Sequence, residues 1–244
     1  MRRWRSTTRH SSPHRSRSMY ERIRCVLFDV GGVLVDWNPE HLYRTVIPSA
    51  DERNRFLTDC CNYQWNHELN LGADVAGAID EKVRRYPDFR LAIEAYYSRW
   101  IEMVPNLVPG IMEIVSDLTR AGLPLHLVTN SPVWAMPKLR ARYPIFENFE
   151  STVTSGEHGV AKPDPKLLAI AHRRTGVARE QLLLIDDRAE NVESAQRMGV
   201  RGVIFTTAKS LREELYRLRV LDSKESGYAE KAGSRPAIDD TRRP

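Results

Sequence analysis

A short apolar run near the N-terminus constrains the fold of this chain more than any other feature of its sequence. Residues 25–28 (Cys-Val-Leu-Phe) are all apolar, and the run ends at Asp29, which is followed by the glycine pair Gly31 and Gly32. Four apolar residues without polar alternation are typical of a strand buried on both faces, as in a parallel sheet. We therefore expect a central strand with Asp29 at its carboxyl end, which is the edge where open α/β sheets bind ligands.

Two kinds of pattern follow this strand. Helix-spaced apolar positions predict a small all-helical insert, with helices at 40–46, 51–61, 73–85 and 89–103. From residue 107 strands and helices alternate, which indicates βα units of a parallel sheet. The expected strands are 123–128, 151–154, 182–185 and 202–205; the expected helices are 109–121, 132–142, 165–175, 189–198 and 208–219; and 155–165 is expected to be a polar loop.

The positive charge of the chain is concentrated at its start. Residues 1–18 hold six arginines and no acid, so the formal net charge of +5 becomes −1 for residues 19–244. A body without excess basic charge is not expected to bind nucleic acid, although the arginine-rich arm leaves that as a minor alternative. No apolar run approaches membrane-spanning length, so we expect no membrane partner.

The two ends of the chain are expected to lack a packed structure. The leader 1–18 is rich in Arg and Ser and has no apolar stretch, which excludes a secretory signal peptide and predicts disorder. Its composition also fits an organelle transit peptide, except that it has no apolar face, and translation starting at Met19 is an equal alternative. Residues 222–244 have no apolar periodicity and are expected to form a flexible tail. Three cysteines without metal-type spacing, Cys25, Cys60 and Cys61, indicate a reducing, cytoplasmic compartment.

Polar side chains follow several of the predicted strands. Asp29, Thr129 and the pair Asp186 and Asp187 each stand at a strand's carboxyl end, and Lys162 lies on a loop that can reach them. Taken singly, each has an ordinary alternative: a hydroxyl that satisfies a turn, an acid that caps the next helix, a solvated lysine. Two adjacent acids need at most one cap, however. Because parallel strands share one carboxyl edge, the ordered set predicts a site for phosphate chemistry.

Four segments resemble the motifs of the haloacid dehalogenase-like (HAD) hydrolase superfamily, in the same order and with the same long gap between the first two. They are FDVGGVLVD (28–36), LVTNS (127–131), KPDP (162–165) and IDDRAEN (185–191). The resemblance implies an α/β fold, with a Rossmann-like parallel sheet, helices on both of its faces, and an inserted all-α cap domain. It divides the chain into a core of 19–37 and 106–221 and a helical cap of 38–105.

The resemblance also implies a role for each motif. Asp29 would be the nucleophile, forming a phosphoaspartate that water then hydrolyses. Thr129 would donate its hydroxyl to a phosphate oxygen, and Lys162 would neutralise both the nucleophile and the transferring group. Asn130 and Gly32 would complete the phosphate-binding set.

A magnesium site is implied by the same motifs. Mg²⁺ prefers one or two carboxylates together with other oxygen ligands. The implied ligands are Asp29, the backbone carbonyl of Gly31, Asp187 and Asp186, with Asp187 favoured over Asp186. Asn191 would be a further ligand or would support one.

One departure from the family pattern keeps other functions open. Most phosphatases of the superfamily carry a second acid two residues after the nucleophile, and here that position is Gly31. General acid–base catalysis is worth roughly 10² to 10⁴-fold in rate. Some family phosphatases that act on sugar phosphates also have glycine there, so we expect a Mg²⁺-dependent phosphatase of a small phosphorylated metabolite. The alternatives are a 2-haloacid dehalogenase that uses Asp29 without metal, and a non-catalytic phospho-ligand binding module. The acidic pair favours metal and phosphate.

The helical insert contains the residues expected to choose the substrate. Aromatic and amide side chains suit a polyol or a sugar, and six residues are candidates to face the cleft: Trp37, Asn38, Trp65, Asn66, His67 and Glu68. The competing interpretation, which we favour, is that both tryptophans belong to the core of the insert. His67 has no metal-ligand companion at helical spacing, so an exposed or hydrogen-bonded imidazole is expected. The substrate and the oligomeric state do not follow from the sequence.

Overall fold

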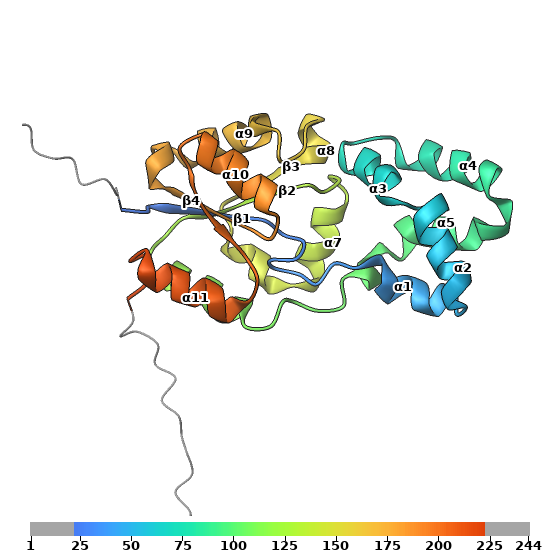
Figure 1. Ribbon diagram of the computed structural model, residues 1–244, viewed down its shortest axis with the longest axis horizontal. Coiled ribbons are helices and arrows are strands. Elements are labelled where there is room, and N and C mark those ends of the chain that lie inside the picture. Colours follow the sequence, from blue (N-terminus) through green and yellow to red (C-terminus); the bar gives the residue numbers. More distant parts are fainter. Residues whose placement is uncertain (1–21, 223–244) are drawn as a thin grey trace, which may run out of the picture.

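The computed structural model describes residues 22–222, and a five-stranded parallel sheet forms its centre (Figure 1). The strand order is β3-β2-β1-β4-β5, which places β1 in the middle, between β2 and β4. The strands are β1 Cys25–Phe28, β2 Leu125–Thr129, β3 Ser151–Thr154, β4 Leu182–Asp186 and β5 Arg201–Ile204. The expected disordered leader 1–18, the alternative start at Met19 and the expected flexible tail beyond Asp222 lie outside the described residues.

Eleven α-helices occur in the described part of the chain. Five of them lie between β1 and β2: α1 Pro39–Val46, α2 Ala50–Arg55, α3 Tyr63–Asn70, α4 Val75–Arg85 and α5 Arg90–Ser98. The others are α6 Ile111–Arg120, α7 Ala135–Arg142, α8 Ser155–His158, α9 Pro165–Thr175, α10 Ala189–Arg197 and α11 Ala208–Arg217. Short 3₁₀ turns occur at Pro87–Phe89, Trp100–Met103, Pro144–Asn148 and Arg179–Gln181, and a π-helical turn at Phe56–Cys60.

The sheet is covered on both faces, as the unbroken apolar run of β1 predicts. Val26 and Phe28 pack toward one face with residues of α6, α7 and α11, and Cys25 and Leu27 pack toward the other face with residues of α9 and α10. Figure 1 shows α9 and α10 on one side of the strands and α11 on the other. The expected Rossmann-like α/β architecture is thereby confirmed.

Helices α1 to α5 form a separate helical body beside the sheet (Figure 1). Its interior is aromatic: the rings of Tyr43 and Phe56 lie 4.6 Å apart, and those of Trp65 and Tyr96 lie 4.7 Å apart. The helical body contacts the part of the chain that follows β3, because the hydroxyl of Ser155 in α8 donates a hydrogen bond of 2.5 Å to the carbonyl of Asn70 in α3. The insert is helical as expected, and the division into a cap of 38–105 and a core stays a prediction.

Several elements differ from the expectations, each for a local reason. Residues 155–158 form a short helix and not a loop, because the Thr154 side chain accepts a hydrogen bond from the Glu157 backbone at its start. The α3 helix was not expected; the Asn62 side chain caps it by accepting from the Trp65 backbone at 3.0 Å. The α6 helix begins at Ile111 and not at residue 109, since Gly110 has a φ of +81°.

Two predicted helices of the insert are interrupted. The segment 51–61 changes to a π-helical turn after Arg55, where the Thr58 hydroxyl bonds the carbonyl of Asn54. The segment 89–103 ends its α-helix at Ser98, whose hydroxyl donates to the carbonyl of Glu94 at 2.8 Å. Hydroxyls that bond the carbonyl four residues back disturb or bend helices. Among residues 22–222 no helix is long and apolar enough to cross a membrane.

Candidate active site

Asp29 directly follows β1, at the carboxyl edge of the sheet. Its Oδ1 accepts hydrogen bonds from the Val30 backbone N–H at 2.6 Å and from the Lys162 ammonium at 3.0 Å. The residue is buried, with 7% of its surface exposed. Burial raises the pKa of Asp29 to about 6, although the charge of Lys162 acts to lower it. With Oδ1 held in this way, the carboxylate has a fixed orientation.

Lys162 lies behind Asp29, between two carboxylates. Its ammonium is 3.0 Å from Asp29 and 2.6 Å from Asp186. Burial acts to lower the pKa of Lys162, but the two carboxylates raise it above its ordinary value, so the side chain is charged. The Asn130 side chain fixes the backbone of this lysine, because it donates to the Lys162 carbonyl at 2.9 Å and accepts from the Lys162 N–H at 2.8 Å.

The two acids at the end of β4 have different surroundings. Asp186 is fully buried and accepts hydrogen bonds from the Lys162 ammonium, from the Arg188 backbone at 3.0 Å and from the Asn191 amide at 2.8 Å. Asp187 is exposed and lines a cavity. Gly32 lies against it, with a φ of +75° and with room for no side chain, since a Cβ there would be 2.6 Å from the Asp187 carboxylate.

The donor atoms at this edge fit a hard cation. One carboxylate oxygen from each of Asp29, Asp186 and Asp187 lies within 4.8 Å of the others. The buried Asn191 adds a carbonyl oxygen that has no hydrogen-bond partner among the described residues. Oxygen donors of this kind suit Mg²⁺. In a magnesium site, this unpaired Asn191 oxygen would accept a hydrogen bond from a water bound to the metal, or would bind the metal itself.

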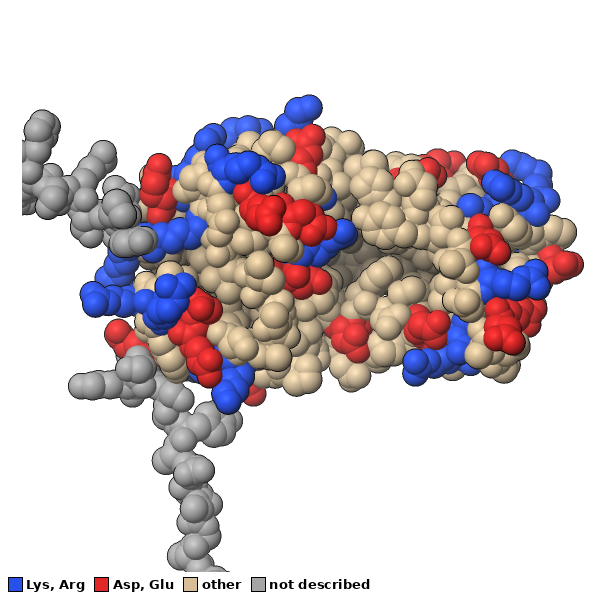
Figure 2. Space-filling view, in the orientation of Figure 1, with Lys and Arg blue, Asp and Glu red and all other residues tan. Residues whose placement is uncertain are grey.

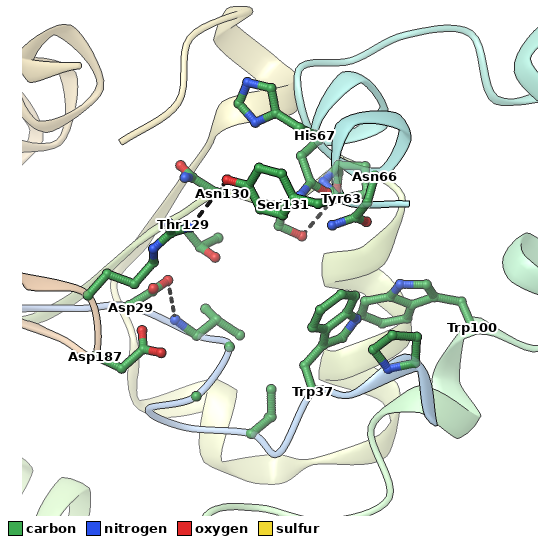
Figure 3. A pocket seen from close by; sticks show the side chains of 18 of the residues that line it. Asp29, Trp37, Tyr63, Asn66, His67, Trp100, Thr129, Asn130, Ser131 and Asp187 are labelled. Atoms are coloured by element: carbon green, nitrogen blue, oxygen red, sulfur yellow. Dashed lines mark hydrogen bonds between the residues drawn. The ribbon is translucent and has the colours of Figure 1, made fainter. Parts of the chain in front are cut away.

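A cavity of about 450 Å³ extends from Asp29 into the helical body. Figure 3 shows Asp29 and Asp187 at one end and Trp37 and Trp100 at the other, and Figure 2 shows the surface hollowed between the two bodies. Thr129, at the end of β2, also lines it. The cavity therefore joins a charged end to an aromatic end.

The structure brings the residues predicted from the motifs together. The cavity is lined by Asp29, Gly31, Gly32, Thr129, Asn130, Asp187 and Asn191, while Lys162 and Asp186 lie directly behind Asp29. Their catalytic, phosphate-binding and metal-binding roles stay predictions. The side chain of Asn130 holds the lysine loop, which is a role that the sequence did not suggest.

The six substrate-facing candidates divide into two groups. Trp37, Asn66 and His67 line the cavity. The other three have structural contacts: Trp65 packs against Tyr96, Asn38 caps α1 by accepting from the Glu40 backbone at 2.9 Å, and Glu68 accepts from Gln64 at 3.0 Å. Other lining residues were not predicted from the sequence, among them Leu57, Tyr63, Tyr96, Trp100 and Arg188. Tyr63 lies between two of the predicted helices, and helical periodicity does not tell which side chains of a helix face a cavity.

Comparison with known proteins identifies the family of this chain. Residues 23–199 match the family described as haloacid dehalogenase-like hydrolase, which is most of the chain. The chain belongs to this family. It is therefore an enzyme of the hydrolase class, and the four motifs recognised in its sequence are those of HAD-like hydrolases.

Several known proteins resemble this chain along most of their length. It is 25% identical to a phosphoglycolate phosphatase of Pectobacterium atrosepticum, over 75% of this chain and 80% of that protein. It is 23% identical to a sesquiterpene phosphatase of Aspergillus oryzae, over 80% and 96%. A HAD family enzyme of Bacteroides thetaiotaomicron, solved in complex with magnesium and inorganic phosphate, shares the fold with a TM-score of 0.58 and 19% identity, over 76% of this chain and 95% of that one.

Proposed function

We propose that this HAD-like hydrolase is a Mg²⁺-dependent phosphatase that cleaves a small phosphate monoester through a phosphoaspartate at Asp29. The observation that carries the proposal is the position of Lys162, which is buried and holds its charge 3.0 Å from Asp29, beside the exposed carboxylate of Asp187. The phosphatase names of the relatives support it, as do the magnesium and phosphate bound by the solved neighbour.

Asp29 would carry the covalent chemistry. Its Oδ1 is held by Val30 and Lys162, which leaves the other carboxylate oxygen to attack phosphorus. The new oxygen–phosphorus bond forms as the ester bond breaks, and the leaving oxygen keeps the electron pair and takes a proton from water. Water then attacks the phosphorus of the acyl phosphate, which releases inorganic phosphate and restores the Asp29 carboxylate.

The other residues would hold and neutralise the phosphoryl group. Lys162 would supply a fixed positive charge at the nucleophile, and the Thr129 hydroxyl, at the end of the adjacent strand, would donate to a phosphate oxygen. Asp29, Asp187 and the backbone carbonyl of Gly31 would hold Mg²⁺, with Asn191 supporting a bound water. When bound, the metal neutralises the oxygens of the transferring group. Asp186 would position Lys162 and Asn191, both of which it bonds.

Hydrolysis of 4-nitrophenyl phosphate by the purified full chain tests the proposal. The assay compares Mg²⁺ with EDTA, and wild type with Asp29→Asn. A matched control is Asp51→Asn, the same change on the exposed surface of α2. We expect turnover that needs both the metal and Asp29 and is unchanged in the control. Turnover independent of Asp29, or release of chloride from a 2-chloro acid without metal, would overturn the proposal; the latter would establish a dehalogenase.

We also propose a reducing compartment such as the cytoplasm, because all three cysteines are buried free thiols. The proposed partner is the small phosphorylated substrate alone. Family membership among the hydrolases favours an enzyme over the non-catalytic binding module considered from the sequence.

A further inference from the structure

The end of the cavity that lies away from Asp29 is an aromatic wall formed by Trp37 and Trp100. Trp100 packs edge-on against Trp134, with ring centroids 5.5 Å apart, and Tyr96 packs edge-on against Trp65 at 4.7 Å. Trp100 and Tyr96 are buried, and Trp37 stands beside Trp100 at the same end of the cavity in Figure 3. Rings fixed by other rings keep one position and present a flat apolar surface to a ligand.

Three neutral amides of the helical body also line the cavity: Asn62, Asn66 and Asn70. Two of them are already fixed through their oxygens. The Asn66 oxygen accepts from the Tyr96 hydroxyl, and the Asn62 oxygen accepts from the Trp65 backbone at 3.0 Å. Their amide NH₂ groups remain as donors. Such donors suit hydroxyl, ether or carbonyl oxygens of an uncharged group.

The cationic side chains at the cavity and at Asp29 that the described residues supply, Arg188 and Lys162, each contact a carboxylate. Two lysines lie nearby without lining the cavity: Lys138 is 5.1 Å from the Trp134 ring, and Lys82 is 5.9 Å from the Trp65 ring. Arg188 is the arginine among the described lining residues; it lies 2.5 Å from the Glu190 carboxylate and donates to the Tyr63 hydroxyl at 3.3 Å. Lys162 lies between two carboxylates. The lining histidine, His67, stacks on the ring of Tyr63. Figure 2 shows the surface on the helical side of the hollow as mostly uncharged.

A second anionic group on the substrate would therefore meet no unpaired cation among the described residues that line this part of the cavity. The charge of the phosphate is met at the Asp29 end, by Lys162 and the proposed metal. A carboxylate placed against the aromatic wall would lose its water without a compensating partner, which is a large cost.

From these observations we infer that the substrate is a phosphate monoester whose leaving group is uncharged and has a flat apolar face that packs against Trp37 and Trp100. The inference rests on the proposed phosphatase function and specifies its substrate class. A volume of about 450 Å³ lies toward the lower end of the usual range for ligand pockets, so the leaving group is compact. An aryl or ring alcohol carrying neutral oxygens has this chemistry.

A matched pair of esters tests the inference. 4-Carbamoylphenyl phosphate and 4-carboxyphenyl phosphate have the same ring and nearly the same shape, and they differ in one negative charge. The full chain is assayed with Mg²⁺ at pH 8, where ordinary imidazoles are neutral. We expect kcat/KM to be at least tenfold higher for the carbamoyl ester, with most of the difference in KM. Equal values, or a preference for the carboxylated ester, would overturn the inference.

Substitutions at two lining residues, Leu57 and Trp37, test where in the cavity the preference for the uncharged ester arises. Leu57→Lys adds a cation to the cavity wall, with Leu57→Met as its neutral control. We expect the lysine variant alone to reduce the preference at least fivefold. Trp37→Ala should raise KM for the carbamoyl ester about tenfold, and Trp37→Phe, which keeps a flat ring, should restore most of the loss. Circular dichroism checks that each variant is folded. An unchanged preference in folded Leu57→Lys would contradict the proposed position of the leaving group.

The two proposals fail differently. Hydrolysis of neither ester, or hydrolysis that survives Asp29→Asn, would remove the phosphatase proposal and the inference with it. Hydrolysis of both esters at equal rates that requires Asp29 and Mg²⁺ would leave the phosphatase proposal standing and remove only the inference about the leaving group.

Discussion

Replacing Lys162 by methionine should destabilise the fold as well as stop catalysis. Methionine has about the length of lysine and no charge, so the change removes the ammonium and keeps most of the packing. Lys162 is 6% exposed and pairs with Asp29 at 3.0 Å and with Asp186 at 2.6 Å. Without it, two buried carboxylates face each other with no cation between them.

The size of the effect follows from these distances. At an effective dielectric constant of about 20, each contact is worth about 6 kcal/mol of Coulomb energy. Much of this is offset by the cost of burying the ammonium, which the variant no longer bears. Removing one partner of a buried ion pair costs about 3–5 kcal/mol of unfolding free energy. Folded domains have about 5–15 kcal/mol in total, so the variant should fold and be markedly less stable.

Urea unfolding in EDTA at pH 7.5 measures this loss. The control is Lys166→Met, the same change at an exposed position in α9, and it should alter the unfolding free energy by less than about 0.5 kcal/mol. Adding Asp186→Asn to Lys162→Met should recover part of the loss, because one of the unpaired charges is then removed. A loss below about 1 kcal/mol for Lys162→Met would refute the argument that this lysine stabilises the buried acids.

Three further changes test other parts of the structure. Gly31→Asp should fold, since the nearest atom to an added Cβ is 3.8 Å away. It should raise kcat at least tenfold, because the new carboxyl group supplies the acid that is missing two residues after Asp29. No gain in a folded variant would show that proton transfer does not limit the rate. Gly32→Ala should weaken activation by Mg²⁺ at least tenfold, because the added Cβ would displace Asp187. Gly122→Ala is the control: its φ of +72° is similar but no atom lies near the added Cβ, so it should only lower stability. The same Mg²⁺ dependence of activity in both variants would contradict this prediction. Burial lowers the pKa of His126, so as the pH falls below about 6.5 this histidine is protonated in the unfolded chain before it is protonated in the folded one. Below that pH the unfolding free energy of the wild type should therefore decrease more than that of His126→Asn. Parallel pH profiles for the two proteins would contradict this prediction.

The sheet and the position of the site were predictable because their signals are local. The apolar run of β1 predicts burial on both faces, and an acid or hydroxyl that ends a strand must lie at the edge where that strand ends. The positions of these residues at the ends of the predicted strands were therefore enough to predict that Asp29, Thr129 and Asp187 lie together. The short helix α8 and the interruptions in 51–61 and 89–103 could not be predicted, since each depends on one side-chain hydrogen bond at a helix end.

Other features of the site depend on residues that are distant in the sequence. The pairing of Lys162 with Asp186, and the close approach of Gly32 to Asp187, join the lysine loop and the first-motif turn to the end of β4. The family motif named both carboxylates as metal ligands and favoured Asp187; the burial of Asp186 and its contact with Lys162 come from the tertiary structure.

The sequence by itself determined the parallel sheet, the helical insert and the edge that carries the polar groups, because periodicity and strand ends are properties of neighbouring residues. The tertiary structure alone decided which aromatic and amide side chains of the insert line the cavity and which pack inside the helical body. Trp65 and Trp100 have the same residue type and are both buried, yet only Trp100 lines the cavity. That difference is set by how the helical body packs on the sheet, and no local pattern encodes it.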